Sequence, residues 1–319
     1  MRATLVGLVW LAACYTPEIA PGVPCAPNGR CPEGQSCIER VCVIPGLIDA
    51  GVDAVLLDMD GDGKPDVMDN CPDKANPDQE NEDGDQFGNA CDPCPAFADD
   101  TPDDDDKDGV ANACDPNPMQ SGDVIELFEG FHHGLPAWTK TGNWTAITDG
   151  IRIDAPAEVA DYIVVPASVT DHVQVFASVE IETVATAVVH YFEVALPNDV
   201  ANNRGIGCEI VQTAVDPTNA RYLSLWDGLN STPNDPPRPP GRELGNAPTF
   251  TWDVKQTYVV SLRRVGTLYT CRVLFNNGTV TLDAPGTSGN GAGVTSPTVV
   301  LRARSLAAHV NWVMVVRSP

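Results

Sequence analysis

Basic residues are scarce in this sequence. Only 19 lysines and arginines stand against 44 aspartates and glutamates, and the formal net charge is −25. Because a chain this acidic repels the phosphate backbone, we expect no nucleic-acid partner. Long hydrophobic runs are also scarce. The one extended run covers residues 3–13, and its eleven residues are too few to span a bilayer as a stable helix.

The N-terminus has the pattern of an export signal, because Arg2 precedes this apolar run. The run ends in Leu-Ala-Ala-Cys at residues 11–14, which resembles the lipobox of bacterial lipoproteins. The resemblance implies a signal peptide over residues 1–13 and a lipid-modified Cys14 that anchors the chain to a membrane, at the outer membrane or cell surface. An ordinary secretory signal with a chance cysteine is the alternative.

The cysteine count agrees with export. Eleven cysteines are present, so lipidation of Cys14 leaves ten, an even number in a compartment where disulfides persist. Residues 25–42 hold four of them with almost nothing apolar to bury, so two disulfides are expected to stabilise this small module. A tether (residues 14–24) and a linker (residues 43–57) are expected on either side of it.

Three pairings are possible within this module, and interlaced Cys25–Cys37 and Cys31–Cys42 bridges are our working hypothesis. A four-cysteine zinc site is the alternative, but the module lacks the tight C-x-x-C turns that such sites favour.

Half of the acidic residues are concentrated in one fifth of the chain. Residues 49–115 hold 22 of the 44 acidic residues and three lysines, a local formal charge of −19. Such a segment is either a disordered spacer or is neutralised by bound cations. The spacing favours cations, because carboxylate or amide side chains recur at positions 1, 3, 5, 9 and 12 of three twelve-residue loops.

Calcium prefers hard oxygen ligands, and alternate positions of a tight loop point towards a common centre. Glycine at position 6 of the first loop, Gly63, permits a sharp turn, and position 7 would contribute its backbone carbonyl. We therefore predict Ca²⁺ ligands in the first loop at Asp58, Asp60, Asp62, Lys64, Asp66 and Asp69, in the second at Asn81, Asp83, Asp85, Phe87, Asn89 and Asp92, and in the third at Asp104, Asp106, Asp108, Val110, Asn112 and Asp115.

The cysteines follow the same repeat. Cys71 and Cys91 are 20 residues apart, Cys94 and Cys114 are also 20 apart, and the second pair is shifted from the first by 23. A repeat of this length with so little apolar content cannot bury a core by itself, so ions and disulfides have to replace the core. A redox interpretation of the C-x-x-C at residues 91–94 is disfavoured, because no βαβ pattern surrounds it.

The segment 58–118 resembles thrombospondin type 3 repeats, nearly position by position over residues 58–79. EF-hands are rejected, because Asp occupies position 12 and Pro is frequent. The resemblance implies Cys71–Cys91 and Cys94–Cys114 disulfides, bound calcium, more than one ion in a repeat, and a wire-like arm poor in helix. The sequence departs from the family at Asn81, at residues 98–100 and at Ala111, which leaves the number of ions open.

Residues 123–319 alternate apolar and polar side chains in short runs with no amphipathic helix, which predicts an antiparallel β-sandwich. In the best run, residues 173–182, the odd-numbered side chains are expected to face the core. Further strands are expected near 144–154, 160–165, 187–196, 206–213, 221–226, 255–264, 267–275, 279–283, 298–304 and 310–316. The fold class is thus mainly β. The opening segment 131–138 and the closing strand 309–315 resemble concanavalin A-like and laminin-G-like jelly rolls.

Two inward-facing cysteines, Cys208 and Cys271, are expected to form a disulfide, with a pair of buried thiols as the alternative. Glu180 and Glu182 faintly resemble a glucanase motif, but a third acid is missing, and charges on a solvated sheet face explain them better. Trp138, Trp144 and Trp226 are expected in the core rather than in a sugar-stacking surface. The segment 227–248 is predicted to be a long loop, and loops of that length often carry function.

The sequence therefore predicts no enzyme but a calcium-binding, lipid-anchored surface protein that mediates adhesion through its sandwich. A glycan or an extracellular protein is the expected ligand. A polysaccharide-active jelly roll and a purely structural spacer are the alternative functions.

Overall fold

The computed structural model describes residues 25–26, 30–31, 35–38, 41–43, 58–156, 160–168, 170–185, 189–199, 204–213, 221–227, 243–247, 250–275, 278–285 and 298–318. The predicted signal peptide, Cys14, the tether and all of the linker except Val43 lie outside these residues. Among the described residues, no helix is long and apolar enough to cross a membrane. The chain forms two compact units, Met1–Glu80 and Asn81–Pro319.

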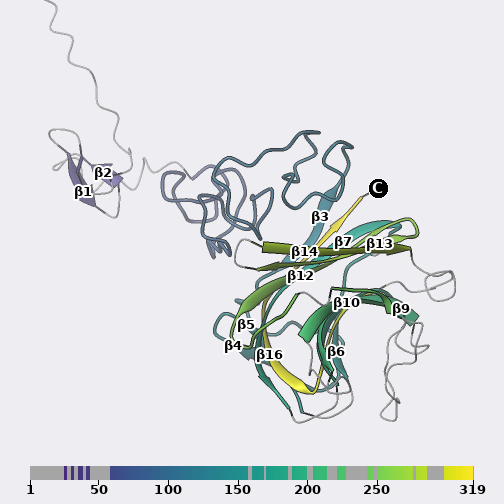
Figure 1. Cartoon of the computed structure of the whole chain (residues 1–319). Helices are drawn as coiled ribbons and strands as arrows, with labels where there is room; N and C mark the ends of the chain where they lie inside the picture. Colours follow the sequence, from purple (N-terminus) through teal and green to yellow (C-terminus); the bar gives the residue numbers. More distant parts are fainter. Residues whose placement is uncertain are drawn as a thin grey trace, which may run out of the picture. The chain divides into compact units, whose positions relative to one another are not determined.

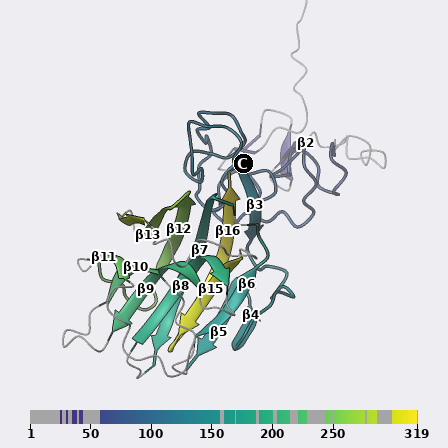
Figure 2. The same ribbon diagram turned by 90° about the vertical axis from the view of Figure 1, so that its right-hand side faces the viewer.

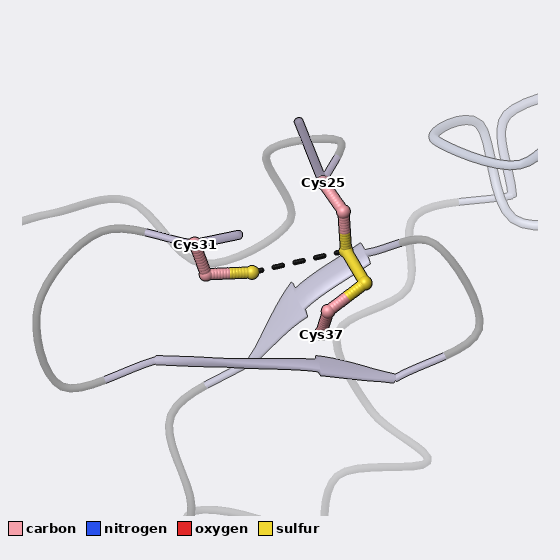
Figure 3. A group of neighbouring side chains, drawn as sticks. All are labelled: Cys25, Cys31 and Cys37. Carbon is pink, nitrogen blue, oxygen red and sulfur yellow. Dashed lines mark hydrogen bonds between the residues drawn. A yellow bond between two sulfur atoms is a disulfide. The ribbon is translucent and has the colours of Figure 1, made fainter. Parts of the chain in front are cut away.

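In the first unit, the small cysteine module is a hairpin of two short strands held by two interlaced disulfides. The strands are β1 (Ser36–Ile38) and β2 (Val41–Val43), and Cys37 lies opposite Cys42. The bridges are Cys25–Cys37 and Cys31–Cys42, which confirms the predicted pairing and excludes the zinc site. The two bridges pack together, with the sulfurs of Cys25 and Cys31 3.7 Å apart (Figure 3).

Most of the second unit is a sandwich of two antiparallel sheets, whose layers face each other in Figure 1. Among the described strands, one sheet has the order β11-β10-β9-β8-β15-β6, and Figure 2 shows β9, β8 and β15 in that succession. Its strands are β6 (Asp161–Val165), β8 (Val189–Asp199), β9 (Arg204–Thr213), β10 (Arg221–Asp227), β11 (Glu243–Ala247) and β15 (Val299–Arg304).

The other sheet has the order β14-β13-β12-β7-β16-β5-β4, and β3 also pairs with β16. Its strands are β3 (Val124–Glu129), β4 (Asn143–Ile147), β5 (Gly150–Ala155), β7 (His172–Val184), β12 (Thr257–Val265), β13 (Leu268–Phe275), β14 (Gly278–Pro285) and β16 (Leu306–Arg317). The predicted mainly-β sandwich is therefore confirmed.

The core lies between the two sheets and follows the predicted alternation. Val173, Val175, Ala177, Val179 and Ile181 on β7 all belong to the central cluster of buried side chains. A disulfide between Cys208 on β9 and Cys271 on β13 joins the two sheets, which confirms the predicted bridge and excludes free thiols. A cross-link over a loop of this length typically adds about 2–4 kcal/mol of stability.

Three elements differ from the sequence prediction. The segment 144–154 is a hairpin rather than one strand, because β4 and β5 pair across a tight turn in which Ile147 lies opposite Gly150. β3 was not predicted. The segment 227–248 is not entirely loop, because β11 adds an edge strand that pairs with β10.

Part of the outer face of the eight-stranded sheet, on β7 and β16, is covered by the second and third acidic repeats. Phe176 on β7 and Trp312, Met314 and Val316 on β16 point out of the sandwich, yet all four are buried. They pack against a group from these repeats, namely Cys94, Ala96, Phe97, Val110, Ala111 and Cys114. The Phe97 ring centre is 5.9 Å from that of Phe176 and 6.2 Å from that of Trp312. The two repeats thus obtain an apolar core by sharing one with the sheet.

Candidate metal sites

Hydrogen bonds from the backbone to acidic side chains shape the three predicted loops, and the same bonds recur in each. At position 1, a side-chain oxygen accepts the N–H of the residue three positions on: the distances are 2.8 Å for Asp58, 2.7 Å for Asn81 and 2.7 Å for Asp104. At position 9, a side-chain oxygen accepts the N–H of position 2, at 2.8 Å for Asp66, 2.8 Å for Asn89 and 3.2 Å for Asn112.

Position 5 uses both of its carboxylate oxygens. One oxygen accepts the N–H of position 7, which is Lys64, Phe87 or Val110. The other accepts an N–H 14 residues further along: Asp62 accepts from Asn76 at 2.8 Å, Asp85 from Asp99 at 3.0 Å, and Asp108 from Gly122 at 2.9 Å. These bonds tie each loop to the next segment of the chain. The ligand role of the position-7 carbonyls stays a prediction.

Positions 3 and 12 differ from the others, because they keep buried oxygens that no hydrogen bond satisfies. At position 3 these atoms are Asp60 Oδ2, Asp83 Oδ2 and both carboxylate oxygens of Asp106; at position 12 they are Asp69 Oδ2 and Asp115 Oδ2. Buried carboxylate oxygens are normally paired, and an unpaired one costs free energy. A cation at each loop centre would satisfy them.

Three carboxylates of each predicted ligand set converge. Possible ligand atoms of Asp58, Asp60 and Asp62 lie within 4.8 Å of one another, as do those of Asp83, Asp85 and Asp92, and those of Asp104, Asp106 and Asp108. All of the donors are oxygens, which suits a hard cation such as Ca²⁺ rather than zinc.

The clustered carboxyl groups have raised pKa values. Burial and neighbouring carboxylates raise the pKa values of Asp60, Asp83 and Asp106. Burial, with Asp83 and Asp85 nearby, raises the pKa of Asp92 to about 6. Burial and the facing carboxyl group of Asp123 raise the pKa of Asp115 to about 7. Without a cation, these groups therefore retain protons at a pH where an exposed aspartate is ionised.

The cysteines of the repeats are all oxidised. Cys94 and Cys114 are joined to each other, as the resemblance implied, and Cys71 and Cys91 are also disulfide-bonded. Because Cys94 bonds to Cys114, the redox interpretation of residues 91–94 is wrong.

Two of the three candidate tryptophans of the sandwich belong to its interior. Trp144 and Trp226 are buried, as expected of core residues, and Trp138 is half-buried and packs against the core. Glu182 accepts a hydrogen bond from Arg152 Nε at 2.8 Å, which is the ordinary ion pair of a sheet face.

The six-stranded sheet carries a row of buried polar and charged side chains that the sequence did not predict. The strand register places Ser224, Glu209, Glu193 and Arg302 side by side on neighbouring strands, and all four are almost fully buried. Arg302 Nη1 lies 2.6 Å from Glu193 Oε2. Burial disfavours the Arg302 charge, but the Tyr191 hydroxyl and the two glutamates hold its pKa above the ordinary value. The row is a sealed ion pair within the sheet rather than a pair of accessible acids.

Comparison with known proteins supports the repeat assignment. A family model described as thrombospondin type 3 repeat matches residues 53–79, which include the first loop. No curated protein matches the chain.

Solved structures resemble the fold at low identity. The carbohydrate-binding module CBM66 from Bacillus subtilis has a TM-score of 0.39 and 11% identity, with 55% of this chain and 91% of that chain covered. The exoplasmic/lumenal domain of VIP36 in its Ca²⁺/Man3GlcNAc-bound form has a TM-score of 0.45 and 12% identity, with 61% and 87% covered. A mutant of the GH43 protein BlXynB from Bacillus licheniformis has a TM-score of 0.42 and 10% identity, with 60% and 39% covered. Similarity at this level says nothing of what the sandwich binds.

At position 4 of each loop the backbone has a positive φ. Gly61 and Gly84 both have φ 79° there, and Lys107 occupies the same position of the third loop with φ 65°. A Cβ at Gly61 or Gly84 would meet nothing within 4 Å, so backbone conformation and not space selects glycine. Lys107→Gly is therefore expected to stabilise the calcium-loaded protein by about 0.5–1 kcal/mol, measured by denaturant unfolding.

The matched control for this prediction is Lys107→Ala, which removes the same charge but keeps the Cβ. Equal stability of the Gly and Ala variants would show that left-handed strain at Lys107 is not the cause.

Proposed function

We propose that this protein binds calcium through its three acidic loops, and that the loaded repeats form a stiff support for a recognition module, the β-sandwich. The observation that supports calcium binding most directly is the set of buried, unpaired oxygens at positions 3 and 12 of the loops. The family-model match to a thrombospondin type 3 repeat supports the same proposal independently.

Calorimetric titration of the EDTA-treated full chain with CaCl₂ tests this proposal. We expect at least three ions to bind, one for each convergent cluster. Protons should be released on binding, because the raised pKa values of Asp92 and Asp115 leave these groups partly protonated near neutral pH. Release is read from the dependence of the binding enthalpy on the ionisation enthalpy of the buffer.

Single substitutions at position 3 are the controls for the titration. Asp60→Asn, Asp83→Asn and Asp106→Asn each remove one unsatisfied carboxylate oxygen and should each weaken a different ion. Absence of binding at millimolar calcium would refute the proposal.

We place the protein at the outer membrane or cell surface, anchored through a lipid on Cys14. The support is the Leu-Ala-Ala-Cys sequence at residues 11–14 after an apolar run. Cys14→Ser is expected to abolish incorporation of a radiolabelled fatty acid in a bacterial host and to release the protein from the membrane fraction. Labelling that is unchanged in Cys14→Ser would contradict the anchor.

The sandwich is proposed to bind a glycan or an extracellular protein, which would make the protein an adhesin. A calcium-organised repeat segment packed against a two-sheet sandwich suits the presentation of a binding surface by a lipid-anchored protein. A glycan array probed with the full chain is expected to show selective binding in calcium that decreases in EDTA. If the chain binds no glycan in calcium or in EDTA, surface cross-linking is the way to search for a protein partner. If neither a glycan nor a protein partner is found, the inert spacer is favoured.

A further inference from the structure

The third loop differs from the first two in the segment to which its position-5 carboxylate is hydrogen-bonded. In every loop the second oxygen of the position-5 carboxylate accepts a backbone N–H 14 residues further along. In the third loop this segment is the entry to the sandwich, because Gly122 and Asp123 directly precede β3. Asp108 Oδ2 accepts the N–H groups of both Gly122, at 2.9 Å, and Asp123, at 2.6 Å. The loop therefore holds the start of β3 directly.

Asp123 is the unusual residue at this junction. The equivalent positions in the first two repeats are Pro77 and Asp100, and Asp100 is exposed, whereas Asp123 is only 1% exposed. One oxygen of Asp123 accepts a hydrogen bond from the hydroxyl of Ser318, the residue that directly follows β16. Its other oxygen, Oδ2, is buried and has no hydrogen-bond partner.

The Asp123 side chain lies beside the third loop, because its own backbone N–H bonds to Asp108 Oδ2 of that loop at 2.6 Å. The Asp123 carboxyl group faces that of Asp115, and its charge also acts on Asp106. Asp115 Oδ2 and both Asp106 carboxylate oxygens are themselves buried without partners. Four orphan oxygens from two parts of the chain thus belong to one acidic group.

A basic side chain does not account for this group. Arg263 on β12 interacts with the charges of Asp123 and Asp115 only at long range. Arg263 donates its hydrogen bond to the Asn117 side-chain oxygen at 3.1 Å. Within the described part of the chain, it forms no ion pair with either aspartate.

We infer that Asp123 is a ligand of a divalent cation shared between the third loop and the sandwich. Asp106, Asp108 and Asp115 supply the loop side of this site, and Asp123 supplies the sandwich side. Because Asp123 precedes β3 and bonds to the residue after β16, the ion ties the loop to the first and last strands of the eight-stranded sheet. This inference rests on the proposed calcium binding and adds a ligand that lies outside the repeat pattern.

The test compares Asp123→Asn with the wild-type full chain and with Asp100→Asn as the matched control. Asp100 is the equivalent residue of the second repeat. Like Asp123 it accepts a hydrogen bond with one carboxylate oxygen, in this case from the backbone N–H of Gln86 at 3.0 Å. In calcium calorimetry, Asp123→Asn should weaken one ion at least tenfold or lose it. Asp100→Asn should keep every affinity within about twofold. Unchanged binding by Asp123→Asn would overturn the inference.

Thermal unfolding, followed by near-UV circular dichroism, separates a ligand from a merely structural aspartate. In EDTA, Asp123→Asn should melt at or above the wild-type temperature, because the change removes one carboxyl group from a buried acidic group that has no counter-charge. In calcium it should melt below the wild type. A melting temperature lowered equally in both conditions, or failure to fold in both, would show a structural role and overturn the inference. If the wild-type chain binds no calcium at all, the proposed function fails instead.

Discussion

Repulsion between converging carboxylates is the constraint on which the repeat segment depends. The ligand atoms of each cluster lie within 4.8 Å of one another, where like charges repel strongly. A domain is stable by only about 5–15 kcal/mol, so it tolerates little uncompensated repulsion of this kind. The charges must therefore be neutralised by cations or protons, and the raised pKa values of Asp92 and Asp115 show the second solution when no cation is present.

The same constraint explains why so much backbone is bonded to side chains in this segment. A loop without a helix or a sheet has no partners of its own for its N–H groups. Here the acidic side chains accept those N–H groups with one oxygen and keep the other oxygen buried and unpaired, as Asp60 and Asp69 do. The side chains thus perform two tasks, building the loop and lining a site, which is why their spacing is so regular.

That regularity is also why the candidate metal sites could be predicted from the sequence, whereas other features could not. The loop positions, the disulfide pairing in the cysteine module and the alternation on β7 depend on contacts that repeat or lie close along the chain. β3 and β11 pair at sheet edges through partners far away in sequence, and their side chains carry little periodic signal. Phe176 and Trp312 have the sequence pattern of outward residues on a solvated face, because nothing local indicates that a repeat covers them.

Asp123 shows the same limit at a single residue. Its equivalents in the earlier repeats are a proline and an exposed aspartate, so no repeat pattern marks it. Its burial involves a hydrogen bond from Ser318 at the other end of the domain, which the sequence does not indicate.

The apolar contact of Phe97 with Trp312 and the acidic group around Asp123 both belong to one junction between the third repeat and β16. Apolar burial holds the repeat on the sheet in any ionic condition, whereas the acidic group opposes that contact unless a cation is bound. The junction is therefore the point at which a cation bound by the third repeat would change the stability of the sandwich.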